Sequence, residues 1–169
     1  MYHTNIHVLE TVNAAFPERL TVPAGMNDIQ ESGRLGRKNQ KGFYKYENGK
    51  KAGPDNSIYQ LVQKNGSQKS FKAAEIVDRC LLLFVNETAR CLEEGILSSP
   101  YDGDAGAVFG LGFPPFLGGP FKYVDFMGAG KVVESLNALA AEHGKRFEPC
   151  ELLKQHAASQ KLFYPDELS

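Results

Sequence analysis

Residues 109–130 read FGLGFPPFLGGPFKYVDFMGAG, a stretch with six glycines and three prolines. Glycines at this density are typical either of a loop that binds phosphate or of a tight turn between helices. A dinucleotide-binding loop follows a strand and spaces its glycines as GxGxxG. Here Gly110 and Gly112 fit the first two positions, but Pro115 occupies the third. A P-loop would need Gly-Lys-Ser or Gly-Lys-Thr, whereas residues 130–132 are Gly-Lys-Val.

The same stretch fits the corner of a helical fold. Pro114-Pro115 forces extended backbone on the residue before each proline. Gly118-Gly119 lets two helices approach closely, because neither residue carries a side chain. Pro120 is suited to the first turn of the next helix. The stretch therefore predicts a turn between packed helices.

Helical periodicity continues on both sides of this turn. The longest predicted helix covers residues 72–94 and ends at Gly95, with Ile76, Val77 and Cys80 at the start of a broad apolar face. That face continues through Leu81, Phe84, Ala89 and Leu92, and is widened by Leu82, Leu83 and Val85. Four further helices are predicted at 102–110 with Asp102 as cap, at 120–127, at 129–143, and at 149–158 starting with proline.

The first part of the chain is less regular. It predicts helices at 5–16, 24–33 and 54–63, and a small β-ribbon at 42–52 around Asn48-Gly49. The fold class is therefore all-α, in two unequal parts. We expect domains at residues 1–63 and 72–169, with residues 64–71 as the linker.

Composition limits the classes of function. The chain has 169 residues, 42% hydrophobic and 23% charged, with a net charge of −1. Such a chain has no overall field that attracts nucleic acid or an acidic membrane, and no apolar run approaches the ~18 residues of a membrane span. Cys80 and Cys91 would lie roughly 16 Å apart along a helix, too far for a disulfide. Three unpaired cysteines are typical of a reducing compartment.

A basic patch is the most distinctive group of polar side chains. Seven cations fall within residues 34–51 against one acid, Glu47, with Phe43, Tyr44 and Tyr46 between them: Arg34, Arg37, Lys38, Lys41, Lys45, Lys50 and Lys51. Basic residues mixed with aromatic ones could bind single-stranded nucleic acid or the phosphates of a nucleotide-bearing ligand. The favoured alternative is a solvated hairpin or a contact to another domain. The candidate phosphate or domain contacts are Arg34, Arg37, Lys38 and Lys41.

Other chemistry-bearing residues do not form a complete set. Asp102, Asp104 and Asp125 could do acid–base work, but capping or surface roles fit their positions better. His3 and His7 have the i,i+4 spacing of metal ligands, without a third ligand nearby. We therefore expect no catalytic residue and no metal site in this chain.

Three longer motifs resemble a known family. Residues 102–125, DGDAGAVFGLGFPPFLGGPFKYVD, resemble the C-terminal part of the α-subunit of the fatty-acid oxidation multienzyme. That family fuses enoyl-CoA hydratase to L-3-hydroxyacyl-CoA dehydrogenase. Residues 33–46, GRLGRKNQKGFYKY, resemble the end of the first of its two helical repeats, and residues 75–97 resemble the opening helix of the second.

The resemblance implies a fold and a role. It implies the helical C-terminal domain of the hydroxyacyl-CoA and 6-phosphogluconate dehydrogenase type, with residues 1–63 as the tail of the first repeat. The NAD-binding motif, the hydratase domain and the catalytic His–Glu pair of the family have no counterpart here. Asp78 stands where the first repeat of the family has an active-site Asn, and an ionised Asp donates no hydrogen bond. The chain alone is thus expected to be inactive.

The resemblance also implies partners. The parent would use NAD and acyl-CoA, and this chain would pack against the upstream Rossmann and hydratase domains, with a thiolase β-subunit as a further partner. The parent would be cytoplasmic in a bacterium, or mitochondrial. The alternative function is an autonomous module that binds coenzyme A or a nucleotide phosphate through residues 34–51.

Overall fold

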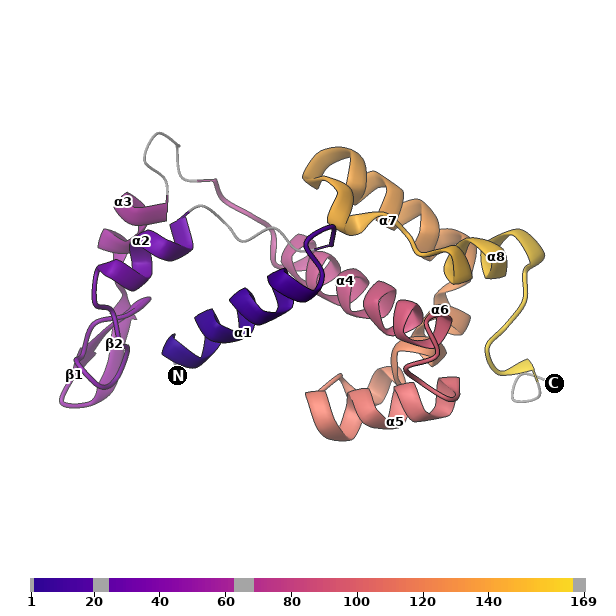
Figure 1. The fold of residues 1–169 in the computed structure, drawn as a ribbon, viewed down its shortest axis with the longest axis horizontal. Helices are drawn as coiled ribbons and strands as arrows, with labels where there is room; N and C mark the ends of the chain where they lie inside the picture. The colour runs from indigo at the N-terminus through magenta and orange to yellow at the C-terminus, as the bar shows by residue number, and fades with distance from the viewer. Residues whose placement is uncertain (1, 20–24, 63–68, 166–169) are drawn as a thin grey trace. The chain divides into compact units, whose positions relative to one another are not determined.

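The computed structural model describes residues 2–19, 25–62 and 69–165, and in it the chain divides into two compact units, Met1–Ser70 and Phe71–Ser169. Both are built mainly from helices, which confirms the predicted all-α class with its small β-ribbon (Figure 1). Most of the predicted linker at 64–71 lies outside the described residues. We refer to the two parts as unit 1 and unit 2.

In its described residues, unit 1 combines helices with one β-hairpin. Its elements are α1 (Tyr2–Ala15), α2 (Gly25–Glu31), β1 (Tyr44–Glu47), β2 (Lys50–Pro54), the 3₁₀ helix η1 (Asn56–Ile58) and α3 (Tyr59–Val62). The strands pair antiparallel, and the turn uses Asn48 at φ 51° and Gly49 at φ 75°. Asn-Gly favours this turn because both residues tolerate positive φ. The predicted ribbon at 42–52 is thus confirmed.

Unit 2 is a helical domain around one long helix. Its helices are α4 (Ala73–Glu93), α5 (Pro100–Leu111), α6 (Pro120–Met127), α7 (Ala129–His143) and α8 (Glu151–Ser159), with the 3₁₀ turns η2 (Pro115–Leu117) and η3 (Lys145–Phe147). Helix α4 packs against α6, α7 and α8, while α5 packs mainly on α6 (Figure 1). The predicted bounds of α6 and α7 are confirmed.

The core of unit 2 lies against the second half of α4. Its buried side chains include Leu82, Val85, Phe121, Leu136 and Leu153. The predicted apolar face of this helix was placed too early, because Ile76, Val77 and Cys80 are exposed. From Leu81 to Leu92, by contrast, every residue except Glu87 is buried or half-buried, so this later part of the helix is covered on most sides.

Two predicted helix starts are corrected. Ser99, not Asp102, caps α5: its hydroxyl accepts a hydrogen bond from the Asp102 N–H at 3.2 Å. Pro100 takes the first helical position, where a missing N–H costs nothing. The last helix begins at Glu151 after Cys150, so Pro149 precedes the helix instead of opening it.

Candidate functional site

The glycine–proline stretch forms the corner between α5 and α6. Gly112 ends α5 with φ 76°, and Gly118 and Gly119 follow with φ 77° and 126°. A Cβ on Gly119 would lie 2.5 Å from Oδ1 of Asp104, closer than real contacts allow. The prediction of close packing is confirmed at Gly119, and the stretch is a helical corner.

Asp104 caps the N-terminus of α6, because the residue at the N-cap position, Gly119, has no side chain that could do so. Its Oδ1 accepts a hydrogen bond from Phe121 N–H at 2.7 Å, and its Oδ2 accepts bonds from Lys122 N–H at 3.2 Å and from the Tyr164 hydroxyl at 2.8 Å. The side chain is buried, and this burial raises the pKa of the carboxyl while the hydrogen bonds oppose the rise. Because both of its oxygens accept backbone N–H groups of the first turn of α6, Asp104 acts as a helix cap, one of the roles predicted for this carboxylate.

Asp125 holds the segment that follows α8. Its two carboxylate oxygens accept hydrogen bonds from the N–H groups of Phe163 at 2.9 Å and Tyr164 at 2.8 Å. The Phe163 ring stacks on the buried His156 ring at 3.9 Å between centroids and contacts Phe121 at 4.7 Å. Asp125 is therefore an anchor for the segment 160–165 and is not a free acid.

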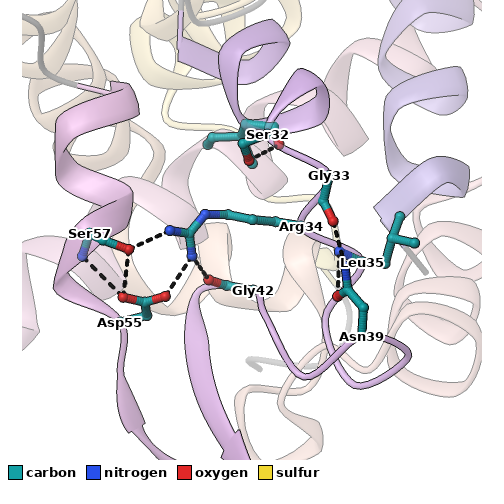
Figure 2. A network of polar contacts seen from close by, with 9 residues as sticks. Ser32, Gly33, Arg34, Leu35, Asn39, Gly42, Asp55 and Ser57 are labelled. Atoms are coloured by element: carbon teal, nitrogen blue, oxygen red, sulfur yellow. Dashed lines mark hydrogen bonds and ion pairs between the residues drawn. The ribbon is translucent and has the colours of Figure 1, made fainter.

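In unit 1, Arg34 is the centre of a buried polar network (Figure 2). It is 3% exposed, pairs with Asp55 at 2.7 Å, and donates to the carbonyl of Gly42 at 2.7 Å and to the Ser57 hydroxyl. Hydrogen bonds from Arg34, and then from Ser57, hold the pKa of Asp55 well below its usual range. The guanidinium thus ties the loop 33–42 to the start of η1.

The loop that follows Arg34 presents its cations outward. Asn39 closes it by accepting from Leu35 N–H at 3.1 Å and donating to the Gly33 carbonyl at 2.5 Å, as Figure 2 shows. Two further backbone bonds join Gly36 and Lys41. The side chains of Arg37, Lys38 and Lys41 are exposed on this closed loop. Of the four predicted contacts, Arg34 is therefore interior and the other three reach the surface.

The remaining candidate residues are dispersed. The His3 side chain lies outside the described residues, and His7 is exposed beside Glu10 at 3.4 Å. Among the described residues no three His, Cys, Asp or Glu side chains come close enough to hold a metal ion. Asp78 is exposed, and its charge adds to the effect of burial in raising the pKa of Tyr123. Within the described part of the chain, no helix has the length and apolarity needed to cross a bilayer.

Among the described residues, the most exposed large apolar side chains belong to unit 2. Four of them are at least 74% exposed: Phe109, Leu111, Phe116 and Phe126. A hollow of about 370 Å³, lined mainly by apolar groups such as Phe84, Ile96, Leu97 and Ala107, opens beside Leu111. Large apolar side chains that are this exposed are candidates for contacts with other protein parts.

One important polar residue gave no signal in the sequence. Asn86 lies inside a hydrophobic run, yet its amide donates to the carbonyl of Glu148 at 2.9 Å and accepts from Cys150 N–H at 2.9 Å. Its partners lie more than 60 residues away, so local periodicity could not indicate the pairing. By contrast, the sequence did indicate the short loop between α7 and α8, because Gly144 and Pro149 interrupt the helical pattern there.

Comparison with known proteins identifies relatives of this chain. Residues 76–164 match the family model of the 3-hydroxyacyl-CoA dehydrogenase C-terminal domain. The fatty acid oxidation complex subunit alpha of Shewanella amazonensis is 48% identical over 149 residues, and that of Shewanella sp. (strain MR-7) is 46% identical over 153 residues. Each alignment covers 87% of this chain, which spans about a fifth (21%) of each relative.

A solved structure supports the fold. The dehydrogenase part of multifunctional enzyme 1 from C. elegans superposes with a TM-score of 0.58 at 23% identity, over 89% of this chain and 36% of that one. Together with the helical corner and the core of unit 2, the match of residues 76–164 shows that this chain belongs to the 3-hydroxyacyl-CoA dehydrogenase C-terminal domain family.

Proposed function

We propose that this chain is a non-catalytic interface domain of a fatty-acid β-oxidation multienzyme. The parent would hydrate enoyl-CoA and oxidise 3-hydroxyacyl-CoA with NAD, and its cofactor would be bound by the upstream Rossmann domain. The observation that carries the proposal is the set of large exposed aromatic side chains of unit 2, with Phe109, Phe116 and Phe126 each at least 84% exposed. The names of the Shewanella relatives support the pathway.

The role follows from what such a surface does. Burial of apolar area contributes roughly 25 cal/mol per Å², so large exposed aromatic rings favour association. In the parent this domain would pack against the upstream dehydrogenase domains and would fix the angle between the bound cofactor and the bound acyl-CoA. An error of about 1 Å in reacting geometry can cost on the order of 100-fold in rate. A thiolase subunit is a further proposed partner.

The proposed location is the bacterial cytoplasm, with mitochondria as the alternative. Its support is that both aligned relatives come from bacteria. Fractionation of the native host, followed with an antibody against this chain, would test the location.

The test of the interface role is a capture experiment. This chain is the bait, and the separately expressed upstream hydratase–dehydrogenase portion is the prey, at low and moderate salt. We expect capture that persists at moderate salt, since apolar contacts are not screened. Phe116→Ala and Phe126→Ala should weaken capture, and Lys131→Ala, an exposed change elsewhere on unit 2, should not. Capture that is unchanged by both aromatic substitutions would contradict the proposal.

A second candidate function rests on the outward cations of unit 1. Arg37, Lys38 and Lys41 sit on a loop closed by backbone hydrogen bonds, and such a loop could hold the phosphates of coenzyme A or a nucleotide. Calorimetry with coenzyme A should then show binding that weakens with salt and with Arg37→Ala or Lys38→Ala, but not with Lys131→Ala. Absence of heat at low salt would remove this candidate.

A further inference from the structure

The hollow of about 370 Å³ in unit 2 lies between α4 and α5. On α4 its lining residues are spaced three and four apart, so that they form one face of the helix. On α5, Gly103 and Gly106 contribute no side chain, and the hollow reaches the helix backbone there. The apolar walls come from both helices and from the loop that joins them: Phe84, Cys91, Ile96, Leu97, Ala107 and Leu111.

The walls of this hollow are held in place by the fold. The backbone N–H groups of Ile96 and Leu97 both donate to the carbonyl of Cys91, at 2.9 and 3.1 Å, which fixes the loop to the end of α4. The Phe84 ring packs against the buried Phe113 ring, with 5.3 Å between their centroids. The hollow is therefore preformed, as sites for small molecules usually are.

The interior of the hollow suits an elongated hydrocarbon. The Thr88 hydroxyl, which is part of the lining, donates to the carbonyl of Phe84 at 2.9 Å and so is directed at its own helix. The lining follows α5 from Asp102 to Leu111, roughly 14 Å along the helix axis. Ile96 and Leu111 are 65% and 74% exposed, so a bound chain would also cover apolar surface at the rim.

The charged residues among the described lining are both acidic. They are Glu87 and Asp102, and both are exposed. Asp102 accepts a hydrogen bond from the Ser99 hydroxyl at 2.8 Å. Glu87 lies 3.5 Å from Nε of Arg90, a residue outside the lining, which offsets part of its charge. The balance at the mouth is negative, and it favours a ligand with a positively charged head group over a carboxylate.

We propose that the hollow between α4 and α5 binds the alkyl chain of a single-chain amphiphile whose head group is positively charged, such as a long-chain quaternary ammonium compound. The chain would lie along α5, with the head group beside Glu87 and Asp102. This site goes beyond the proposed function and does not depend on it, because neither Phe116 nor Phe126, on which the interface role is tested, belongs to its lining.

The test is an NMR titration of the methyl-labelled 169-residue chain with decyltrimethylammonium, below the concentration at which it forms micelles. We expect saturable shifts of the methyl signals of Leu97, Ala107 and Leu111. Butyltrimethylammonium should bind at least about tenfold more weakly, because it buries less hydrocarbon. Decanoate should bind about fivefold more weakly at low salt, because its charge is reversed. Shifts that do not saturate, or equal binding of the decyl and butyl compounds or of the cation and decanoate, would overturn the proposal.

Two glycines of α5 supply a matched pair of variants. A Cβ on Gly106 or on Gly110 would meet no atom within 4 Å, and only Gly106 lines the hollow. Gly106→Leu should therefore keep the fold, fill the hollow and weaken decyltrimethylammonium binding at least about tenfold, whereas Gly110→Leu should leave the binding unchanged. Binding that survives Gly106→Leu, or that both variants weaken equally, would overturn the site. The titration uses this chain alone, so its result is independent of the capture experiment.

Discussion

The change Gly119→Ala should strongly destabilise unit 2. The new Cβ would meet Oδ1 of Asp104 at 2.5 Å, and the backbone at φ 126° disfavours any side chain. The backbone strain costs about 1–2 kcal/mol. Displacement of Asp104 would strand the buried Phe121 N–H and weaken the bond to Lys122 N–H, at about 1–3 kcal/mol for each group. The sum is roughly 3–8 kcal/mol, a large part of the ~5–15 kcal/mol of a typical domain.

Two matched controls divide this sum into its parts. Gly112→Ala places a side chain at φ 76° with no atom within 4 Å, so it should show the strain alone, about 1–2 kcal/mol. Gly130→Ala lies in α7 with ordinary φ and open space, and should be neutral or stabilise by up to about 1 kcal/mol. Urea unfolding followed by the methyl NMR signals of Val124 and Val132 measures all three. Equal losses of unfolding free energy for Gly119→Ala and Gly112→Ala would refute the packing argument.

Three further results are expected. Leu136→Ala, at a fully buried site, should lower the unfolding free energy of unit 2 by about 2–5 kcal/mol in the same urea assay, and a loss under 1 kcal/mol would show a looser core. Asp55 has a lowered pKa, so the stability that it gives unit 1 is complete above pH 3.8, its ordinary pKa, and is lost as the pH falls below that value. Asp55→Asn should flatten this pH dependence in an acid titration followed by the Ile58 methyl signals, and an unchanged profile would contradict the expectation. Tyr164→Phe removes one hydrogen bond to Asp104 and should cost about 1 kcal/mol and speed amide exchange at Phe163, whereas unaltered exchange would show that Asp125 alone holds the segment.

The sequence alone was enough to locate the elements whose ends are set by a single glycine or asparagine. Gly128 and Gly144 flank α7, and Asn48-Gly49 turns the hairpin, and in each case a single residue's backbone preference sets the boundary. The glycine–proline corner could be told from a phosphate loop by residue identity alone. For the same reason α6 and α7 were located to the residue.

The polar contacts could not be predicted, because their partners are distant in the chain. Arg34 looked like one cation of a surface patch, and only the fold brings Asp55 to it from 21 positions away. Asp104 reaches Tyr164 across 60 positions. The exposed start of α4 was misjudged for a related reason: periodicity shows that a helix has an apolar face, but not which stretch of that face its neighbours cover.

The central claim is that this domain contributes assembly and no chemistry of its own. The most direct measurement is NADH formation from a 3-hydroxyacyl-CoA by the upstream hydratase–dehydrogenase portion, with and without an excess of this chain, beside the chain alone. We predict no turnover by the chain alone and a rise in the upstream activity on mixing. Turnover by the chain alone, or upstream activity that is unchanged at saturating chain, would contradict the account.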